Sequence, residues 1–432
     1  MTDMLRETLL VRREEYLSRL LELVSADTSV VGHGIDGGGE EAGQIILERV
    51  MREMGAETSR EPLTEEIVQE GLRRFGEGNP GHVYSGDGFS RWNLVGRFRG
   101  GAGRSIMFDG HVDTMPSGPR ELWSFDPHDA HVRDGRVYGL GTADMKGGLM
   151  ASLMAVKLLQ DSGIPLPGDV TILSVVDEEG GGNGSLAAML AGHRADAAVV
   201  CEPSDGSVTI AHMGFVFFRV EVGGVALHSG SKWKGVNAIE KAVLLMQALN
   251  EMEHEWLMKY RHPMLPPPTL NVGVIEGGTA GSTVPDRCAF KLCLHYHPGT
   301  MTHESVVRET TERLLLRAAG DPWLKDNPPR ISIYQAGGAF EIDAGHPFVT
   351  AVESSIEASR GARPPVVGSP AGNDARLLRN IGGMPVVITG PGSQEQCHSP
   401  DEFLELEDYF RYIEIYARLI LEWCGREEED GR

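Results

Sequence analysis

The stretch "RSIMFDGHVD" (residues 104–113) joins a short apolar run directly to a histidine and an aspartate that stand two positions apart. The run at 105–108 has the length and composition of a buried strand. Polar side chains that follow such a strand lie at its carboxyl end, where α/β sheets bind ligands. His111 and Asp113 are therefore either a hydrogen-bonded structural pair or the first part of a metal site.

The same arrangement recurs along the chain. "DVTILSVVDEE" (169–179) predicts a buried strand that ends in two adjacent glutamates, and "ADAAVVCEP" (195–203) predicts another that ends in one glutamate. "DMKGGLMASLMAVKLLQDSG" (144–163) has apolar residues on all sides and predicts a buried helix. Alternating strands and helices predict an α/β fold, with a mostly parallel sheet and helices on both faces. The polar, Gly-rich stretch 56–90 predicts irregular surface structure.

The pattern changes after residue 212. "FVFFRVEVGG" (215–224) alternates apolar and polar residues, as a half-exposed strand does. A helix, two strands and a second helix follow, which predicts a small α+β domain inserted into the first. We therefore expect a metal-binding catalytic domain of residues 1–212 and 330–432, and an inserted domain of residues 213–329.

Composition restricts the class of partner. The 432 residues include 40 basic and 62 acidic side chains, a formal net charge of −22. This charge argues against binding to nucleic acid or to an anionic membrane surface. There is no apolar run of about 18 residues and no signal-peptide pattern. Five scattered cysteines without a C-x-x-C motif favour a reducing compartment, so we expect a cytoplasmic protein.

Several acids and two histidines stand at predicted strand ends or at a helix start. They are His111, Asp113, Asp144, Glu178, Glu179, Glu202 and His398. Each has a structural explanation by itself; an aspartate at a helix start, for example, is most simply an N-cap. If they converge, however, their mutual repulsion requires a cation. Imidazole and carboxylate are zinc ligands, and a spare carboxylate beside a metal-bound water can take its proton. Solvated acids and a metal centre both remain open on the pattern alone.

A set of motifs in a fixed order narrows the choice. They are "GHVDTMP", "GLGTADMKGG", "VVDEEGGGNGS", "CEPS", "ALHSGSKWKGVNAI", "GGTAGSTVPD" and "GPGSQEQCHSPDE". In these motifs the chain resembles, over about residues 10–424, the dinuclear zinc family of acetylornithine deacetylase, succinyl-diaminopimelate desuccinylase, aminoacylase and glutamate carboxypeptidase. The resemblance implies a zinc-peptidase-like catalytic domain. It also implies a metal-dependent amidohydrolase that cleaves the amide bond of a small N-acyl amino acid through a metal-bridging water.

The resemblance also implies the cofactors and their ligands. Two divalent metal ions are expected, zinc by preference, with cobalt or manganese as alternatives. Asp144 would bridge both ions. His111 and Glu202 would complete the ligands of one ion, and Glu179 and His398 those of the other.

Three further roles follow from the same resemblance. Asp113 would hold the imidazole of His111 and fix its tautomer. Glu178 would be the general base and then the general acid. His228, in "ALHSG" on the inserted domain, resembles a histidine that stabilises the oxyanion, and in dimeric relatives it reaches the partner's active site. The inserted domain would then serve as lid and dimerisation domain of a homodimer.

The substrate-binding residues depart from the family pattern. Many relatives carry an arginine that binds the substrate's carboxylate where this chain has "CLHYHPG", with His295 and His297. Arg376, in "GNDARLLRN", either binds an acidic group of the substrate or is a surface or helix-end arginine, and Gly390 offers a backbone N–H near the site. Alternative activities on the same site are those of a carboxypeptidase or dipeptidase and of a formylaminopyrimidine deformylase. A non-catalytic binding protein on this scaffold would lack a ligand or the base, and neither is missing.

Overall fold

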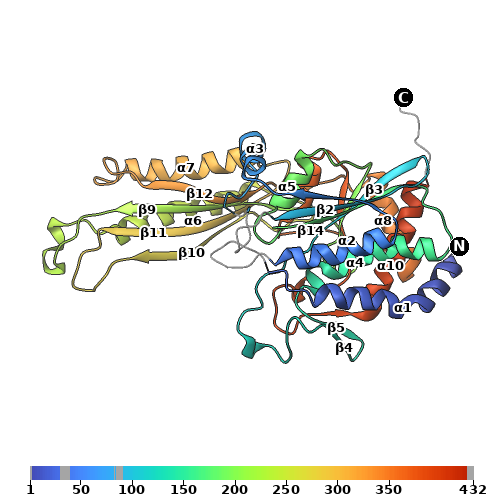
Figure 1. Cartoon of the computed structure of the whole chain (residues 1–432). Coiled ribbons are helices and arrows are strands. Elements are labelled where there is room, and N and C mark those ends of the chain that lie inside the picture. Colours follow the sequence, from blue (N-terminus) through green and yellow to red (C-terminus); the bar gives the residue numbers. More distant parts are fainter. Residues whose placement is uncertain (1, 30–38, 82, 84–90, 426–432) are drawn as a thin grey trace. The chain divides into compact units, whose positions relative to one another are not determined.

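The computed structural model describes residues 2–29, 39–81, 83 and 91–425 (Figure 1). The chain forms two compact units. The larger unit comprises Met1–Ile210, Ile342–Val367 and Asn373–Arg432, and the smaller unit comprises Ala211–Glu341 and Gly368–Gly372.

A nine-stranded sheet, most of whose strands lie in the larger unit, has the order β1-β2-β6-β3-β7-β15-β8-β13, and β14 also pairs with β8. Its strands are β1 (Glu57–Pro62), β2 (Trp92–Phe98), β3 (Gly103–His111), β6 (Gly168–Val175), β7 (Ala198–Val200), β8 (Val208–His212), β13 (Phe340–Glu341), β14 (Val366–Ser369) and β15 (Val386–Ile388). The central strands β6, β3, β7 and β15 run parallel, and the pairs β1–β2, β2–β6 and β8–β15 are antiparallel. The predicted mostly parallel α/β sheet is confirmed.

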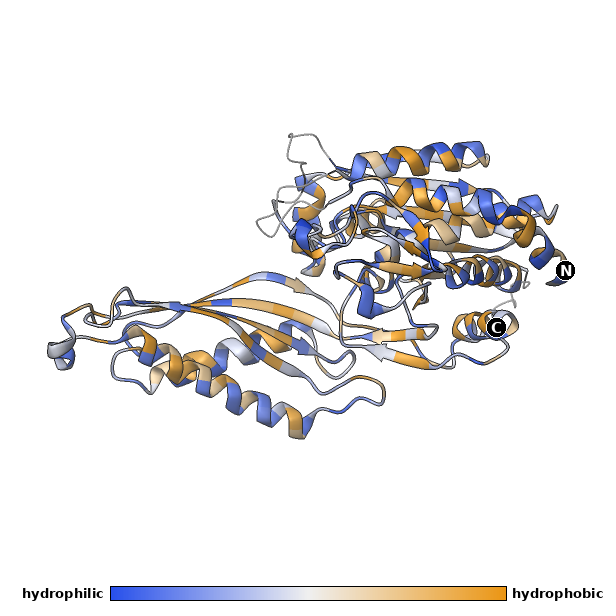
Figure 2. Cartoon of the chain, turned by 90° about the horizontal axis from the view of Figure 1, so that it is seen from below, coloured by the Kyte–Doolittle hydropathy of each residue, from blue (hydrophilic) through white to orange (hydrophobic). Residues whose placement is uncertain are grey.

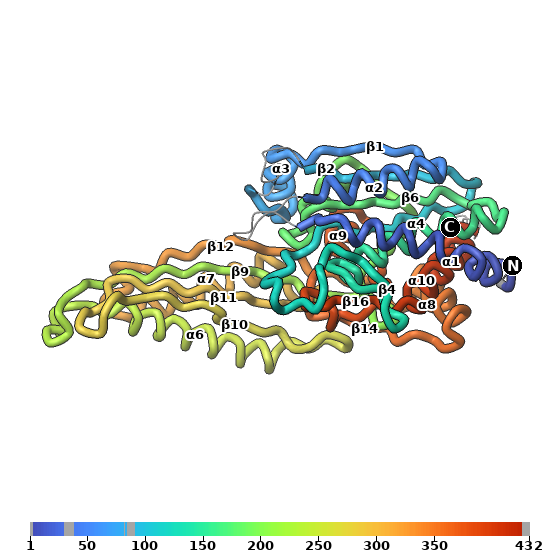
Figure 3. The backbone as a smooth tube through the Cα atoms, turned by 60° about the horizontal axis from the view of Figure 1, so that its bottom comes forward, coloured from blue at the N-terminus to red at the C-terminus, as the bar shows by residue number. Residues whose placement is uncertain are grey.

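Two groups of helices cover this sheet (Figures 1 and 3). In one group α10 packs against α4, α8 and α1, and in the other α5 packs against α3 and α9. The helices of the larger unit are α1 (Thr2–Val24), α2 (Glu40–Glu53), α3 (Glu65–Phe75), α4 (Gly147–Asp161), α5 (Asn183–Leu190), α8 (Pro347–Arg360), α9 (Ala375–Asn380) and α10 (Leu406–Cys424). A small three-stranded sheet joins β16 (Phe403–Glu405), β5 (Arg136–Tyr138) and β4 (His131–Arg133). No helix in the described part of the chain is long and apolar enough to span a bilayer.

The expectation of irregular structure across 56–90 is wrong for residues 57–62 and 65–75, whereas residues 76–81 are irregular as expected; residues 82 and 84–90 lie outside the described residues. Residues Glu57–Pro62 form the edge strand β1, and Glu65–Phe75 form helix α3. The hydroxyl of Thr64 caps the first turn of α3, and Gly76 ends the helix in the left-handed conformation with φ of 69°. Strand β1 is mostly exposed, so its side chains carry no apolar run, and its backbone pairing with β2 determines its conformation.

The smaller unit is a four-stranded antiparallel sheet covered by two helices. The sheet has the order β10-β11-β9-β12. Its elements are β9 (Gly214–Gly223), α6 (Ala238–Lys259), β10 (Thr269–Gly277), β11 (Arg287–Tyr296), α7 (His303–Ala319) and β12 (Arg330–Gly337). Hydrophobic and hydrophilic residues alternate along these helices (Figure 2), as expected of helices with one buried side.

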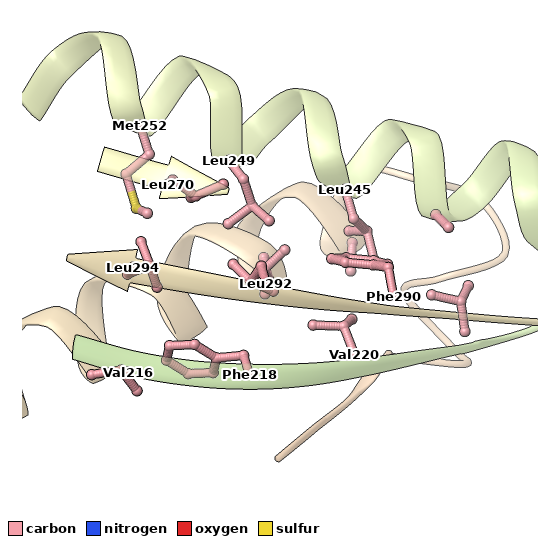
Figure 4. Packing of buried hydrophobic residues seen from close by; sticks show 14 of the residues in the cluster. Val216, Phe218, Val220, Leu245, Leu249, Met252, Leu270, Phe290, Leu292 and Leu294 are labelled. Carbon is pink, nitrogen blue, oxygen red and sulfur yellow. The ribbon is translucent and has the colours of Figure 1, made fainter. Parts of the chain in front are cut away.

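Alternate residues of β9 and β11 form the core of the smaller unit (Figure 4). Every second residue from Gly214 to Val222 is buried, as the alternation in the sequence predicts. The side chains that pack together come from β9, β11 and α6, and include Val216, Phe218, Val220, Phe290, Leu292, Leu294, Leu245, Leu249 and Met252. This core is separate from the parallel sheet, so the unit has its own hydrophobic cluster.

The predicted domain boundary at residue 330 needs correction. Strand β12 (Arg330–Gly337) pairs with β9 along most of its length, from Arg330 opposite Glu221 to Gly337 opposite Phe215. The smaller unit consequently extends to Glu341 and not to residue 329. Most side chains of β12 are partly or fully exposed, so the strand shows no local pattern that would assign it to one sheet or the other.

Candidate metal centre

The candidate site lies at the carboxyl edge of the four parallel strands of the larger unit. His111 is the last residue of β3, and Glu179 and Glu202 follow the neighbouring strands β6 and β7 by a few residues. His398 follows β15 after a loop that contains a short 3-10 helix. Because adjacent parallel strands end at the same edge, residues that are far apart in the sequence meet there.

These side chains form two groups of potential metal ligands that share one aspartate. His111 Nε2 lies 3.1 Å from Asp144 Oδ1 and 3.7 Å from Glu202 Oε1. His398 Nε2 lies 3.4 Å from Asp144 Oδ2 and 3.0 Å from Glu179 Oε2. Within each group the three ligand atoms all lie within 4.8 Å of one another. Asp144 thus presents one carboxylate oxygen to each group.

The charges of this cluster fit divalent cations. Burial raises the pKa of Glu202 well above its usual range, and the charge of Asp144 adds to it. Burial would raise the pKa of Asp144 as well, but hydrogen bonds with His111 and His398 lower it below its usual value. Hydrogen bonds to Asp144 and then to Glu179 raise the pKa of His398 to about 11. Three nearly buried carboxylates within reach of two imidazoles are a ligand set for hard or borderline divalent metals.

Asp113 supports the cluster through its backbone and its carboxylate. His111 Nδ1 lies 2.8 Å from the backbone oxygen of Asp113 and therefore donates to it, which leaves Nε2 as the ligand atom. The carboxylate of Asp113 accepts the backbone N–H groups of Glu178 at 3.3 Å and Glu179 at 3.1 Å. The carbonyl of Asp113 thus orients the imidazole, and its carboxylate orients the two glutamates.

Asp144 does not cap a helix. It lies within Thr142–Lys146, a single π-helical turn before α4, and its φ of −115° and ψ of 93° are not helical. The carboxylate of Glu402 accepts the N–H groups of Gly141 at 2.8 Å, Ala143 at 2.7 Å and Asp144 at 3.1 Å. The sequence did not predict a role for Glu402. Its position four residues after His398 is the one feature of the sequence that could have indicated such a role.

Two of the predicted site residues belong to the smaller unit. His228 is exposed and precedes the short 3-10 helix Ser229–Lys234, where its Nδ1 accepts the N–H of Gly230 at 3.1 Å. His295 is half-buried on β11, with Nε2 3.4 Å from the Sγ of Cys293, and burial lowers the pKa of this imidazole. Their contacts lie within that unit, whereas the ligand cluster lies within the larger one.

Arg376 is buried in the larger unit, with 2% of its surface exposed. Its Nε donates to Glu77 Oε2 at 3.2 Å, its Nη2 to the carbonyl of Gly181 at 3.0 Å and its Nη1 to the carbonyl of Asn373 at 2.7 Å. These bonds connect α9 to the loop that follows the two glutamates.

Gly390 packs against the end of β7. A Cβ atom at this position would lie 2.3 Å from the carbonyl oxygen of Cys201, so only glycine fits. Its N–H donates to the hydroxyl of Ser204 at 3.2 Å, and Tyr412 lies 2.8 Å from the same hydroxyl. The glycine thus lets the loop after β15 pass close to the residue that precedes Glu202.

Comparison with known proteins identifies the family. The model of peptidase family M20/M25/M40 matches residues 107–422. The chain is 31% identical to the N-formyl-4-amino-5-aminomethyl-2-methylpyrimidine deformylase of Bacillus subtilis, over 80% of this chain and 85% of that protein. It is also 31% identical to the acetylornithine deacetylase of Vibrio parahaemolyticus, over 77% and 84% respectively. An M20 family metallo-carboxypeptidase from Sulfolobus solfataricus shares the fold, with a TM-score of 0.75 at 18% identity over 95% of this chain and all of that one.

The fold, the ligand groups and these relatives agree with the resemblance that the motifs indicate. The chain belongs to peptidase family M20/M25/M40 and is a metal-dependent hydrolase of amide bonds.

Proposed function

We propose that this enzyme hydrolyses the amide bond of a small N-acyl compound at two divalent metal ions that share Asp144. His111 and Glu202 would hold one ion, and Glu179 and His398 the other. The proposal rests on the position of the Asp144 carboxylate: its Oδ1 lies near His111 and its Oδ2 lies near His398. A carboxylate with this geometry is suited to bridge two ions.

The chain's own residues supply the proton transfer. When bound, two divalent ions polarise the amide carbonyl and make a bound water acidic. Glu178 is the proposed base, because it follows β6 beside Glu179 and is not part of either ligand group. Burial raises the pKa of Glu178 well above its usual range, and the charge of Asp374 adds to it. A carboxylate with a raised pKa accepts the proton of the water and then donates it to the departing amine nitrogen.

Zinc is the metal that we propose, with cobalt and manganese as alternatives. Two imidazole nitrogens and three carboxylates suit zinc, and manganese also accepts ligands rich in carboxylate. The test is a titration of the metal-free protein with each metal, followed by measurement of bound metal. We expect two equivalents per chain, and saturation at one equivalent or none would contradict a shared Asp144.

An N-acyl amino acid is the first candidate substrate class, as in a deacetylase or desuccinylase. The similarity to an acetylornithine deacetylase over most of both chains supports it. Chemically, the site needs only an amide carbonyl within reach of the ions and of Glu178. The substrate's carboxylate would have to be bound elsewhere in the enzyme.

A deformylase that acts on an N-formyl aminopyrimidine is the second candidate. Strand β11 ends with His295 and Tyr296 where many relatives place an arginine for the substrate's carboxylate. A neutral imidazole is a weaker anchor for a carboxylate than a guanidinium is. The similarity to the Bacillus subtilis deformylase supports a substrate without a carboxylate.

The proposed functions of the smaller unit are those of a lid and of a dimerisation domain. Strand β10 is at the edge of its sheet, and Val274 and Ile275 on it are 40% and 50% exposed. An exposed apolar edge strand is a surface suited to pairing with a second copy. We propose a homodimer in which His228 stabilises the oxyanion. We also propose that the enzyme works in the cytoplasm and binds neither nucleic acid nor membranes. The net charge of −22 supports the absence of nucleic-acid and membrane partners.

One screen separates the candidate substrates. Purified enzyme loaded with zinc, cobalt or manganese would be given N-acetyl, N-succinyl and N-formyl amides, each with and without a carboxylate on the amine part, and dipeptides. An N-acyl amino acid hydrolase requires the carboxylate, whereas an aminopyrimidine deformylase prefers the formyl compounds that lack it. Absence of amide hydrolysis across the metal-loaded series would contradict the proposed function.

A further inference from the structure

The loop that connects β6 to α5 carries Glu178 and Glu179 in a conformation that needs outside support. It begins at Asp177, whose φ of 67° is unusual for a residue other than glycine. Gly181 and Gly182 also have positive φ, at 132° and 83°. Such backbone persists only where its surroundings hold it. We call Asp177–Asn183 the base loop, and three groups of side chains hold it.

The first support is a buried pair of hydrogen bonds to the carboxylate of Asp177. Arg91 Nη1 donates to its Oδ1 at 2.7 Å, and Asn183 Nδ2 donates to its Oδ2 at 2.7 Å. All three side chains are almost completely buried, and Arg91 also pairs with Glu40. Both oxygens of the carboxylate are therefore fixed, and with them the start of the base loop.

The second support comes from Asn79, which follows α3. Its backbone N–H donates to Asn183 Oδ1 at 2.8 Å, and its carbonyl accepts from Asn183 Nδ2 at 2.9 Å. Its side-chain amide donates to the carbonyl of Gly180. The fit is close, because a Cβ on Gly181 would lie 2.9 Å from the amide nitrogen of Asn79. Asn79 is thus bonded to the middle and to the end of the base loop.

The third support is Arg376. It donates to the carbonyl of Gly181 at 3.0 Å, while its Nε donates to Glu77, two residues before Asn79. All three of its nitrogen atoms donate to protein acceptors, and only 2% of its surface is exposed. A guanidinium in this state is not available to an acidic group of a substrate.

We propose that Glu77, Asn79 and Arg91, together with Arg376, form a buttress that positions the base loop. Arg376 is accordingly a positioning residue and does not bind the substrate. Glu77, Asn79 and Arg91 precede residues 107–422, the part that the family model matches. The inference rests on the proposed role of Glu178 only for its effect on turnover. Its effect on the order of the loop is independent of that role.

The test compares Arg376→Ala and Asn79→Ala with Arg379→Ala in the metal-loaded full chain. Arg379 is on the same short helix, and its guanidinium donates a long bond of 3.4 Å to the carbonyl of Met384, away from the base loop, so it is the matched control. Amide hydrogen exchange would be followed in peptides that span 176–185. Bound metal, kcat and KM would be measured on the best amide from the screen described above.

We expect both test variants to exchange at least about tenfold faster in these peptides than the wild-type enzyme, and the control to be unchanged. Their kcat should fall by about ten- to a hundredfold, because a displaced base loses alignment with the water. KM should stay within about twofold of wild type. Arg376→Lys should not restore kcat, since a single ammonium nitrogen cannot reach the three acceptors that the separate guanidinium nitrogens contact.

The opposite results would overturn the proposal. One is an unchanged rate of amide hydrogen exchange across 176–185 in Asn79→Ala. The other is a tenfold rise in KM at unchanged kcat in Arg376→Ala, with KM partly restored in Arg376→Lys. The second result would instead assign Arg376 to an acidic substrate group. Asn79→Ala removes one amide and leaves the buried Arg376 ion pair in place, so it provides a folded variant if the arginine variant is unstable. Faster exchange is expected even if Glu178 is not the base, which separates this inference from the proposed function.

Discussion

The carboxylates of the ligand cluster in the larger unit and the imidazole of His228 in the smaller unit lie in different environments. At the carboxyl edge of the parallel sheet, Asp144, Glu179 and Glu202 are nearly buried and crowd two imidazoles. In the smaller unit, His228 is exposed and its imidazole contacts the backbone of the next turn. The difference shows that the topology of the parallel sheet fixes the ligand cluster of the larger unit, whereas the imidazole of His228 is held by a local backbone contact.

The largest effect is expected when the proposed base is removed from the carboxyl edge of the parallel sheet. Glu178→Gln should lower kcat by about a hundred- to ten-thousandfold, because an amide cannot take up the proton. Two equivalents of metal should remain bound, since Glu178 is in neither ligand group. Steady-state kinetics and metal analysis on one preparation check this. Glu179→Gln is the matched control and should lose metal, and near-normal turnover in Glu178→Gln would refute the assignment.

A second variant removes a large side chain from the hydrophobic core of the smaller unit. Phe290 is fully buried between α6 and the sheet (Figure 4). Phe290→Ala should destabilise this unit by about 3–5 kcal/mol, through lost burial and the cavity left behind. Chemical denaturation of the full chain should show an earlier transition for this unit. Metal content of the folded protein should not change, and loss of metal would contradict the independence of the two cores.

His228→Ala tests the exposed histidine of the smaller unit, and we expect it to affect turnover without affecting stability. Because the side chain is exposed, we expect no change in the unfolding transition and no loss of metal. Turnover should fall by about ten- to a hundredfold if the imidazole donates to the oxyanion. Unchanged kcat and KM across the pH range would remove His228 from the mechanism. His254, a histidine of α6 for which the sequence offers no role, is the control position.

The smallest effect is expected at an ordinary ion pair of the smaller unit. Burial would raise the pKa of Asp321, but hydrogen bonds from Lys241 and from two backbone N–H groups lower it below 3.8. A depressed folded-state pKa adds stability that is complete above pH 3.8 and is lost as the pH falls further. Asp321→Asn should therefore cost about 1 kcal/mol at pH 7, and the difference from wild type should shrink near pH 3. A difference that stays constant with pH would contradict the pairing.

Much of this architecture follows from local pattern. The apolar runs before His111, Glu178 and Glu202 predict parallel strands, and their common edge explains why the predicted ligands meet. The alternation in β9 predicts a half-exposed sheet. In each case a single stretch of chain carries the signal.

The features that could not be predicted from the sequence depend on contacts between residues that are far apart in the chain. Strand β12 belongs to the smaller unit only through its pairing with β9. Glu402 supports Asp144 from 258 residues away, and Arg376 reaches Glu77 across 299 residues. Strand β1 is mostly exposed and shows no apolar run. Local periodicity contains no information about such pairings, so they require the folded structure.

The most direct test of the central claim is a crystal structure of the zinc-loaded enzyme with anomalous data at the zinc edge. Two anomalous peaks are expected, one between His111, Glu202 and Asp144 Oδ1, and the other between His398, Glu179 and Asp144 Oδ2. A single peak, or zinc at a place where Asp144 is not a ligand, would contradict the account.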